Sequence, residues 1–247
     1  MSRVREVIYD VLEVYDSIAP GYSSWRGRPW KIVNLLRGGL VLDLGSGHCV
    51  NGAYLASRKD VRYLICLDIS PSMLEEARKL LSRRGVLLAE FVAADATAIP
   101  LRGDSTDSVV SIAMIHHLPD SEARKAFKEV ARVLRPSGMA IVTSWSRKQL
   151  RFVPRTLLIH LLKLLRIPGP HDYRVSWRRR DRTYVRRYFL YEAEELRRLA
   201  EEVGLKVLSY GYITRSNSLN SYIVLSKPVL AEGSPRPPPR LSGSSQL

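Results

Sequence analysis

The sequence has little cysteine: two residues, Cys49 and Cys66, in a chain of 247. Disulfide-stapled secreted domains and zinc ribbons both need more cysteines than this. We therefore expect neither a disulfide framework nor a cysteine-rich zinc site, and no bound metal. Two thiols kept reduced are typical of a cytoplasmic protein, which is the location we expect.

Long apolar runs are also missing. No stretch of 18 apolar residues occurs, and the N-terminal segment MSRVREVIYDV is charged and amphipathic. A membrane-spanning helix needs about 20 apolar residues and a signal peptide needs an apolar centre, so we expect a soluble protein. Residues 228–247 have few apolar side chains and much proline, serine and glycine, which predicts a disordered tail.

Acidic residues are outnumbered: 24 Asp and Glu face 39 Lys and Arg, which gives a net charge of +15. Residues 147–187 hold 13 of the basic residues and only two acids, so this basic insert accounts for most of the excess. Such a field attracts polyanions, and we expect substrate contacts from Arg178, Arg179, Arg180 and Arg186. In the alternative interpretation, the arginines decorate a solvated face of a protein from a generally basic, thermophile-like proteome.

The most informative stretch is LVLDLGSGHCVNGAYLA at residues 40–56. Its apolar block predicts a buried parallel strand, and Asp43 lies near the strand's carboxyl end, where open α/β sheets bind ligands. Gly45 and Gly47 permit a tight turn and a close approach of the backbone to a ligand. A single GxG pair also occurs in ordinary strand-turn-helix corners, so the assignment of a ligand site depends on the residues at the ends of the following strands.

Two more acids follow apolar strands: Asp68 ends YLICLD, and Asp95 follows FVAA. A carboxylate at the position of Asp68 is suited to bind the two hydroxyls of a ribose. Three acids at three successive strand ends favour a nucleotide-type cofactor over a structural coincidence. A nicotinamide site would require GxGxxG, but Val50 stands where the third glycine belongs.

With these motifs, residues 40–146 resemble the Rossmann-like class I S-adenosylmethionine-dependent methyltransferases. The resemblance implies an α/β fold, with a seven-stranded sheet covered by helices on both faces and an antiparallel edge hairpin. One departure is Cys49, where the family usually has glycine; this makes the turn less permissive, although a cysteine there need not clash if its φ stays negative. The resemblance implies that S-adenosylmethionine binds at Asp43, Gly45, Ser46, Gly47, Asp68, Ile69, Asp95, Ala96 and Ala113.

Periodicity and turn residues place the remaining elements in a single domain over 1–227, with an N-terminal helical lid at 1–39 and the basic insert at 147–187. Helices are expected at 3–18, 51–58, 71–84, 122–134, 192–203 and, more briefly, after Pro29. Strands are expected at 40–44, 61–67, 86–93, 108–114 and 139–145, with a hairpin at 206–212 and 219–225.

The segments YDSIAPGYSSWRGRPW, SIAMIHHLPD and RRYFLYEAEELRRLAEEVG resemble the wobble-uridine tRNA methyltransferases, which methylate the carboxymethyl group of 5-carboxymethyluridine. The resemblance covers most of residues 12–227. It departs at Phe189, where the family tends to histidine, and at Ser221-Tyr222, where the family has tryptophans. It implies a tRNA substrate and a small zinc-binding activator subunit as the partner in a heterodimer.

A carboxylate acceptor is already ionised at neutral pH, so it needs a cation and hydrogen-bond donors but no general base. We expect Arg26 to bind this carboxylate. We expect one of His116 and His117 to be functional and the other structural, and the family resemblance favours His116 as the functional one. Tyr22 and Trp25 are the candidates for stacking on a base, whereas Tyr15 and Trp30 lie at apolar helical positions and are expected to pack.

Two other functions remain open. The segment FVPRTLLIHLLKLLRIP predicts a basic amphipathic helix, which would suit a membrane-associated methyltransferase of a lipid or quinone. The chain could also be a catalytically silent RNA-binding or partner-activating module. The intact acids at 43, 68 and 95 oppose the silent module, and the arginine run favours RNA over lipid.

Overall fold

The computed structural model describes residues 3–20, 22, 27–165, 172–179, 182–215 and 218–229. Within residues 3–10, 163, 177–179 and 182–184 it describes the backbone alone. Nearly all of the tail expected at 228–247 therefore lies outside the described residues, and that expectation stays a prediction.

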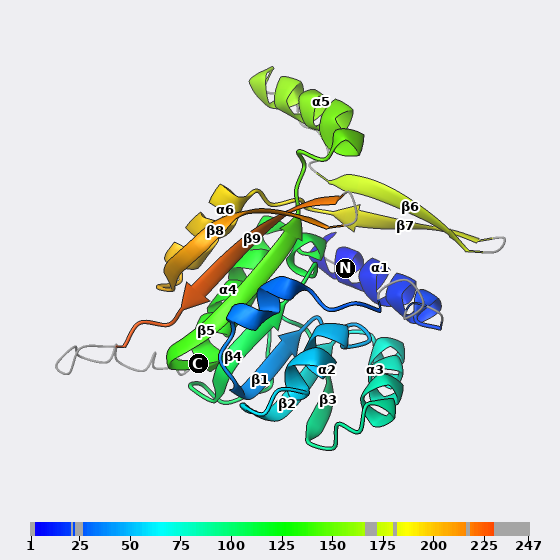
Figure 1. Ribbon diagram of the computed structural model, residues 1–247. Helices are drawn as coiled ribbons and strands as arrows, with labels where there is room; N and C mark the ends of the chain where they lie inside the picture. Colours follow the sequence, from blue (N-terminus) through cyan, green and yellow to red (C-terminus); the bar gives the residue numbers. More distant parts are fainter. Residues whose placement is uncertain are drawn as a thin grey trace, which may run out of the picture.

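A seven-stranded sheet forms the centre of the molecule, in the order β3-β2-β1-β4-β5-β9-β8 (Figure 1). Strands β1 to β5 pair in parallel, while β9 runs antiparallel between β5 and β8. The expected Rossmann-like sheet with an antiparallel edge hairpin is confirmed. The strands are β1 (Gly39–Leu44), β2 (Val61–Asp68), β3 (Ala89–Ala93), β4 (Thr106–Ser111), β5 (Leu134–Trp145), β8 (Lys206–Arg215) and β9 (Ser218–Ser226).

Helices cover both faces of this sheet. Neighbouring residues of β1 point to opposite faces: Leu42 packs in the core on the side of α4 and α6, and Val41 in the core on the side of α2 and α3. The continuous apolar character of this strand follows from burial on both sides. The helices are α1 (Arg3–Ile18), α2 (Val50–Ala56), α3 (Pro71–Arg83), α4 (Asp120–Val133), α5 (Val153–Leu164) and α6 (Ala193–Glu201), with short 3-10 turns η2 (Lys31–Leu35), η3 (Ile115–His117) and η4 (Leu150–Phe152).

Three expected boundaries were wrong. The third strand begins at Ala89, where its pairing with β2 starts, and the side chains of Leu87 and Leu88 before it are exposed. The fourth strand ends at Ser111, before Ala113 adopts a positive φ of 57° and the chain turns into η3. Strand β5 begins directly after α4, so that Pro136 to Gly138 lie within an irregular first part of the strand.

Helix α1 packs against α3 and β7, above the carboxyl ends of the strands (Figure 1). The Asp16 carboxylate accepts hydrogen bonds from the Ser70 hydroxyl (2.5 Å) and the Ser72 backbone N–H (3.1 Å). Ser70 is also the N-cap of α3, where its hydroxyl oxygen accepts a bond from Met73 N–H. The N-terminal helix is thus tied to the start of α3 by hydrogen bonds as well as by apolar contacts.

The basic insert forms α5, which lies within the expected amphipathic segment, and a two-stranded hairpin of β6 (Tyr173–Arg179) and β7 (Arg182–Tyr188). The sequence did not lead us to expect the hairpin. Phe152, Ile159, Tyr173, Tyr188 and Leu190 form a small core that holds these elements to the end of β5. Helix α5 stands away from the sheet, while the hairpin runs over α1 (Figure 1). None of the helices described has the length and apolar character that crossing a bilayer requires.

Candidate cofactor and acceptor site

The loop after β1 is fastened to the end of β2. Backbone N–H groups of Gly45 and Ser46 both donate to Leu67 O, at 2.8 and 3.0 Å. Gly45 has a φ of 69°, and a Cβ there would lie 2.1 Å from the Met114 side chain. Glycine is therefore required at this position for conformation and for space.

Asp68, at the end of β2, accepts a hydrogen bond from Gly47 N–H (2.7 Å) and another from Ser70 N–H (2.9 Å). Burial raises the pKa of the Asp68 carboxyl above its ordinary value, although these two backbone donors lower it. Its backbone donors thus do not fully offset the loss of water, and two further donors from a ligand would favour the ionised form.

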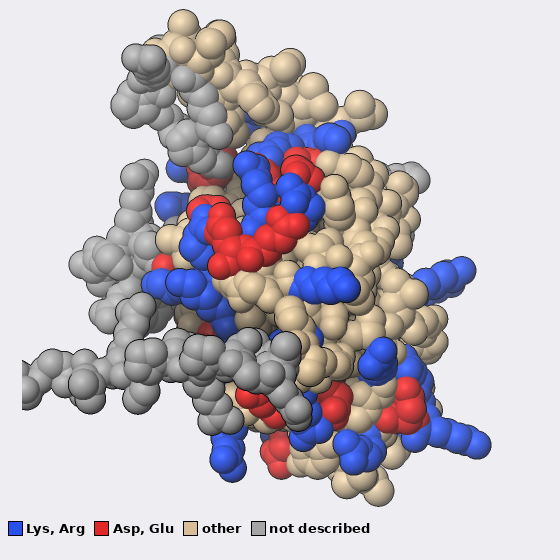
Figure 2. Space-filling view, turned by 90° about the vertical axis from the view of Figure 1, so that its left-hand side faces the viewer, with Lys and Arg blue, Asp and Glu red and all other residues tan. Residues whose placement is uncertain are grey.

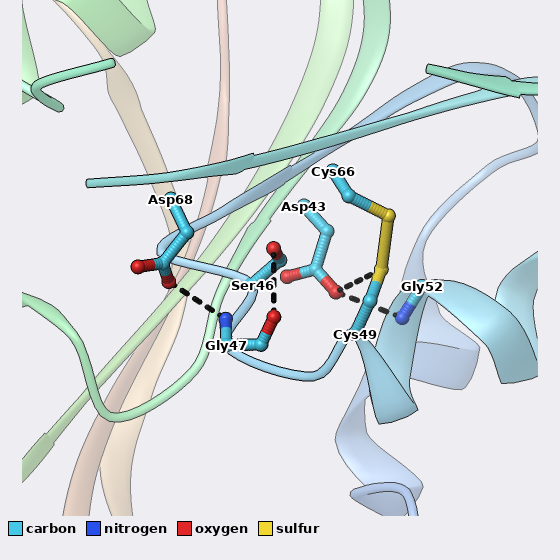
Figure 3. Close-up of a disulfide and its surroundings, with 7 residues drawn as sticks. All are labelled: Asp43, Ser46, Gly47, Cys49, Gly52, Cys66 and Asp68. Atoms are coloured by element: carbon cyan, nitrogen blue, oxygen red, sulfur yellow. Dashed lines mark hydrogen bonds between the residues drawn. A yellow bond between two sulfur atoms is a disulfide. The ribbon is translucent and has the colours of Figure 1, made fainter. Parts of the chain in front are cut away.

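Asp43 lies behind the loop and is 1% exposed. Its Oδ2 accepts a hydrogen bond from Gly52 N–H (2.9 Å), which ties the first turn of α2 to β1 (Figure 3). Burial raises the pKa of Asp43 from 3.8 to about 7, with the nearby charge of Asp68 adding to the increase against the effect of the Gly52 N–H. Asp43 is not among the residues that line the pocket, so its position is that of a support for the loop.

The two cysteines are bonded to each other, and both are fully buried. Our expectation of free, reduced thiols was therefore wrong. Figure 3 shows the Cys49–Cys66 disulfide beside Asp43, joining the end of the loop to β2. Cys49 does not keep the negative φ that would make a cysteine unstrained in this turn, because its φ is 59°. Nothing in the local sequence signalled the pairing, since the partners are 17 residues apart.

A pocket opens in front of these strand ends. Asp95 is held there by Thr97, whose backbone N–H and hydroxyl both donate to Asp95 Oδ1 at 2.8 Å. The pocket brings together most of the expected cofactor residues, namely Gly45, Ser46, Gly47, Asp68, Ile69, Asp95, Ala96 and Ala113.

The opposite wall of the pocket comes from α1 and η3. Tyr15 Oη lies 3.0 Å from His117 Nε2, and the ring of Tyr22 meets Tyr15 and His48 edge to face. Tyr15, Tyr22 and His117 all line the pocket. Sequence reasoning had assigned Tyr15 to packing; its position in the last turn of the expected N-terminal helix gives no sign that its hydroxyl points inward.

His116 lies behind this wall. It is 1% exposed, accepts a hydrogen bond from Trp145 N–H at Nδ1 (3.3 Å) and stacks on the Trp145 ring. The structure therefore places His117 at the pocket and His116 in the packing between η3 and β5. Our preference for His116 as the functional histidine does not match this geometry.

Among the expected substrate residues, Arg186 reaches the same wall from β7. Its guanidinium lies 5.5 Å from the Tyr188 ring centroid, and although burial acts to lower the pKa of Arg186, Tyr15 and Tyr188 outweigh it and raise the pKa. Arg178 and Arg179 belong to β6, of which only the backbone is described there. Trp25, Arg26 and Arg180 lie outside the described residues.

The pocket also contains residues that sequence reasoning missed. Trp30 is 7% exposed at the pocket and donates its backbone N–H to Asn51 Oδ1 (2.9 Å). Arg28 and Arg215 line the same side. Arg215 is the last residue of β8, and its guanidinium donates a hydrogen bond to the backbone oxygen of Arg28. The two residues are 187 positions apart in the sequence, so only the tertiary fold brings them together.

Known proteins resemble this chain in part of its sequence. Residues 41–138 match the family model described as a methyltransferase domain. Over 145 residues the chain is 38% identical to the tRNA (carboxymethyluridine(34)-5-O)-methyltransferase ALKBH8 of Mus musculus, covering 56% of this chain and 20% of that protein. The identity is 32% with the tRNA (carboxymethyluridine(34)-5-O)-methyltransferase of Saccharomyces cerevisiae, for 56% of this chain and 49% of that one. The aligned part thus spans half or less of these relatives.

Solved structures support the same fold. One is a chain of the complex between the Haloferax volcanii Trm112 methyltransferase activator and a putative methyltransferase, with a TM-score of 0.68 and 17% identity over 90% of this chain and 99% of that one. Another is a SAM-dependent methyltransferase from Methanosarcina mazei, with a TM-score of 0.65 and 20% identity over 82% and 99%. Residues 41–138 form a methyltransferase domain, and the chain has the fold of the class I S-adenosylmethionine-dependent methyltransferases.

The pocket of this methyltransferase suits S-adenosylmethionine. The partly buried Asp68 carboxylate lines the pocket and can accept hydrogen bonds from two ribose hydroxyls, in addition to those from the backbone. The glycine turn brings backbone close to the ligand, and Ile69 and Ala96 supply apolar lining that suits an adenine. The residues present therefore fit the cofactor that the family uses.

We predict that Asp68→Ala weakens S-adenosylmethionine binding by about tenfold or more, because charge-assisted hydrogen bonds contribute roughly 1.5–3 kcal/mol each. Isothermal titration calorimetry measures this directly. Glu75→Ala, an exposed acid on α3, is the control and should bind as the unaltered protein does. Unchanged affinity in a folded Asp68→Ala protein would contradict the assignment of Asp68 to the ribose.

A second prediction concerns pH. The pKa of Asp43 is raised in the folded protein, so its contribution to stability is present below about pH 4 and is lost as the pH rises through about 7. Relative to Asp43→Asn, which carries no charge, the unaltered protein should lose on the order of a few kcal/mol of unfolding free energy between pH 4 and pH 8. Urea unfolding of both proteins at several pH values tests this, and parallel pH profiles would contradict it.

Proposed function

We propose that the chain methylates tRNA, transferring the methyl group of S-adenosylmethionine to the carboxylate of 5-carboxymethyluridine at the wobble position. The observation that carries the proposal is the 32–38% identity, over 145 residues, to proteins named for this reaction. The part of the chain that matches the methyltransferase family model, residues 41–138, includes the cofactor loop and η3 with its two histidines. The acceptor wall of the pocket adds chemistry that suits such a substrate.

The reaction asks for alignment more than for acid-base catalysis. The cofactor supplies a methyl group on a sulfonium, and the acceptor carboxylate is already ionised at neutral pH. The chain has to hold the two reacting atoms in line, within about 3–3.5 Å, in a pocket that excludes water. Tyr15 and His117 supply paired polar groups at the pocket wall, and Arg186 supplies a cation beside them. Arg26 stays a second candidate for binding the carboxylate.

Three arginines of the insert offer a place for RNA phosphates. Arg151, Arg155 and Arg174 line a hollow of about 660 Å³ beside α5 and β6. Asp172 accompanies them: its carboxylate lies 3.6 Å from Arg174 Nε, and its backbone oxygen accepts from Arg155. The hollow therefore keeps a positive balance, and phosphates are the groups that arginine binds best.

Aromatic rings connect this hollow to the pocket. Phe152 lies 6.3 Å from Trp145, Trp145 lies 4.9 Å from Tyr188, and Tyr188 lies 4.9 Å from His117, all between ring centroids. The hollow and the acceptor wall therefore lie close together, with this small core of rings between them. This supports contacts from the insert to nucleotides that flank the methylated one.

The proposal predicts that the purified protein, together with its partner where one is required, converts carboxymethyluridine in tRNA to its methyl ester. Mass spectrometry of nucleosides from a tRNA that carries the unmethylated acid measures the product. Binding should weaken with salt by about 0.7–0.9 log units per phosphate contact for each log unit of salt, and Arg155→Gln with Arg174→Gln should reduce that slope. Arg197→Gln is the control, because Arg197 is paired with Glu194 and Glu201 on α6.

Two results would redirect the proposal. If no ester forms but a methyl group appears elsewhere in the RNA, the chain is still a tRNA methyltransferase, and the carboxylate is not its acceptor. A flat salt slope with tight binding to anionic liposomes would favour the membrane-associated alternative. The observation behind that alternative is a row of leucines on the outer face of α5, Leu157, Leu158, Leu161, Leu164 and Leu165, which are 44–80% exposed.

We also propose a heterodimer with a small zinc-binding activator subunit. The structural neighbour from Haloferax volcanii was solved in complex with the Trm112 methyltransferase activator. In this chain, no described strand pairs with the outer side of β8, and Leu208, Tyr210 and Tyr212 are 40–48% exposed along it. An open edge with apolar side chains is suited to strand addition by a partner.

The face around β8 suits a protein better than a polyanion. Figure 2 looks onto the side of the molecule that carries α6 and β8, where Lys and Arg are interspersed with Asp and Glu and uncharged surface lies between them. The Arg197 ion pairs with Glu194 and Glu201 belong to α6. Charges of both signs in close mixture give little net attraction for RNA.

Co-expression tests the partner proposal. With an activator subunit present, the two chains should co-purify, and Leu208→Lys should abolish this because it places a charge on the edge that is covered. Leu161→Lys is the matched control, since Leu161 on α5 is about as exposed as Leu208, at 51% against 48%. A soluble, monodisperse single chain that methylates tRNA equally well with and without the subunit would refute an obligate partner.

A further inference from the structure

The disulfide occupies a particular place in the cofactor site. Cys49 is the N-cap of α2, the last residue of the loop, and Cys66 lies in β2 beside Asp43, its register partner on β1. Their Cα atoms are 6.4 Å apart, within the range that a disulfide spans. The bond therefore links the far end of the loop to the strand that ends in the ribose acid Asp68.

The backbone at Cys49 has a conformation that side chains disfavour. Its φ of 59° and ψ of 37° lie in the left-handed region, which glycine adopts without cost and cysteine does not. Local hydrogen bonds support this turn: Cys49 N–H donates to Ser46 O, and Cys49 O accepts from Ala53 N–H, both at 2.8 Å. The surroundings must hold the residue there against its own preference.

The loop is attached to β2 at both ends. At its start, Gly45 and Ser46 donate to Leu67 O, and Gly47 donates to Asp68. At its end the attachment is the covalent bond to Cys66. Between the two attachments, Gly47 and His48 line the cofactor pocket, and Val50 and Asn51 line it directly after the second one. Movement of Cys49 would shift these lining residues and the Gly52 N–H that Asp43 accepts.

We propose that the Cys49–Cys66 disulfide is a positioning element for the cofactor: it holds Cys49 in the left-handed conformation and so keeps the loop in its binding shape. This inference concerns binding of the methyl donor and goes beyond the proposed choice of acceptor. Reducing the bond with a dithiol transfers two electrons and two protons to the cysteines and oxidises the dithiol to its own disulfide. The Cys49 thiol formed in this way has Asp43 Oδ2 only 3.4 Å from its sulfur and becomes able to donate to it.

Burial adds a kinetic expectation. Both cysteines are 0% exposed, so a dithiol reaches them only when the loop opens. A ligand in the pocket contacts the residues around Cys49 and opposes that opening. S-adenosylhomocysteine, the product of the donor, should therefore slow the appearance of free thiols.

The test compares three variants by calorimetry with S-adenosylmethionine, in the absence of RNA. Cys66→Ala and Cys49→Ala both break the bond and keep a residue other than glycine at position 49. The affinity for the donor should then fall about tenfold, because that residue has to pass into the disfavoured left-handed conformation when the donor binds. Cys49→Gly also breaks the bond but removes the conformational cost, and it should recover most of the affinity. This rescue separates positioning of the loop from a general effect of losing a crosslink.

Two measurements on the unaltered protein complete the test. Alkylation under denaturing, non-reducing conditions should find no free thiol, and mild reduction should lower the affinity for the donor without loss of the far-ultraviolet circular dichroism. Two free thiols, unchanged affinity in Cys66→Ala, or equal loss in Cys49→Gly and Cys49→Ala would each overturn the proposal. Because no RNA takes part, failure to methylate tRNA would leave this result intact.

Discussion

Two carboxylates at the ends of neighbouring strands determine the shape of the pocket: Asp43, which is buried, and Asp68, which is partly buried. They lie at the carboxyl ends of β1 and β2, and each accepts a backbone N–H from the loop or from the first turn of α2. A carboxylate removed from water is costly unless donors reach it, so the chain after β1 has to fold back over both acids. The glycine turn, the start of α2 and the donor-binding wall all follow from this constraint.

The same strand end also positions the acceptor side. Ser70, two residues after Asp68, binds Asp16 of α1, and the preceding residue of that helix, Tyr15, binds His117. The hairpin β6–β7 then lies over α1 and brings Arg186 to the tyrosines. Donor and acceptor walls thus share one support, so a shift at the end of β2 is transmitted to both.

Charge and apolar surface are divided among different parts of the molecule. Arginines of the insert line a hollow connected by aromatic rings to the pocket, whereas the side with α6 and β8 mixes both signs around an open apolar edge. This division supports RNA on the insert and a protein at the edge strand. The leucine face of helix α5 is exposed in the described part of the chain. Neither RNA at the hollow nor a protein at the edge strand would by itself cover it.

The sequence by itself determined the sheet, the glycine loop and its three acids, because strand ends, turn glycines and apolar periodicity are local properties that tertiary contacts rarely override. It did not determine which histidine faces the pocket, since His116 and His117 are neighbours and only the packing of η3 against Trp145 separates them. The hairpin of the insert escaped prediction because its arginines mask the alternation of a strand. The disulfide and the inward hydroxyl of Tyr15 depend on residues distant in sequence, and such contacts exist only once the sheet has brought those residues together.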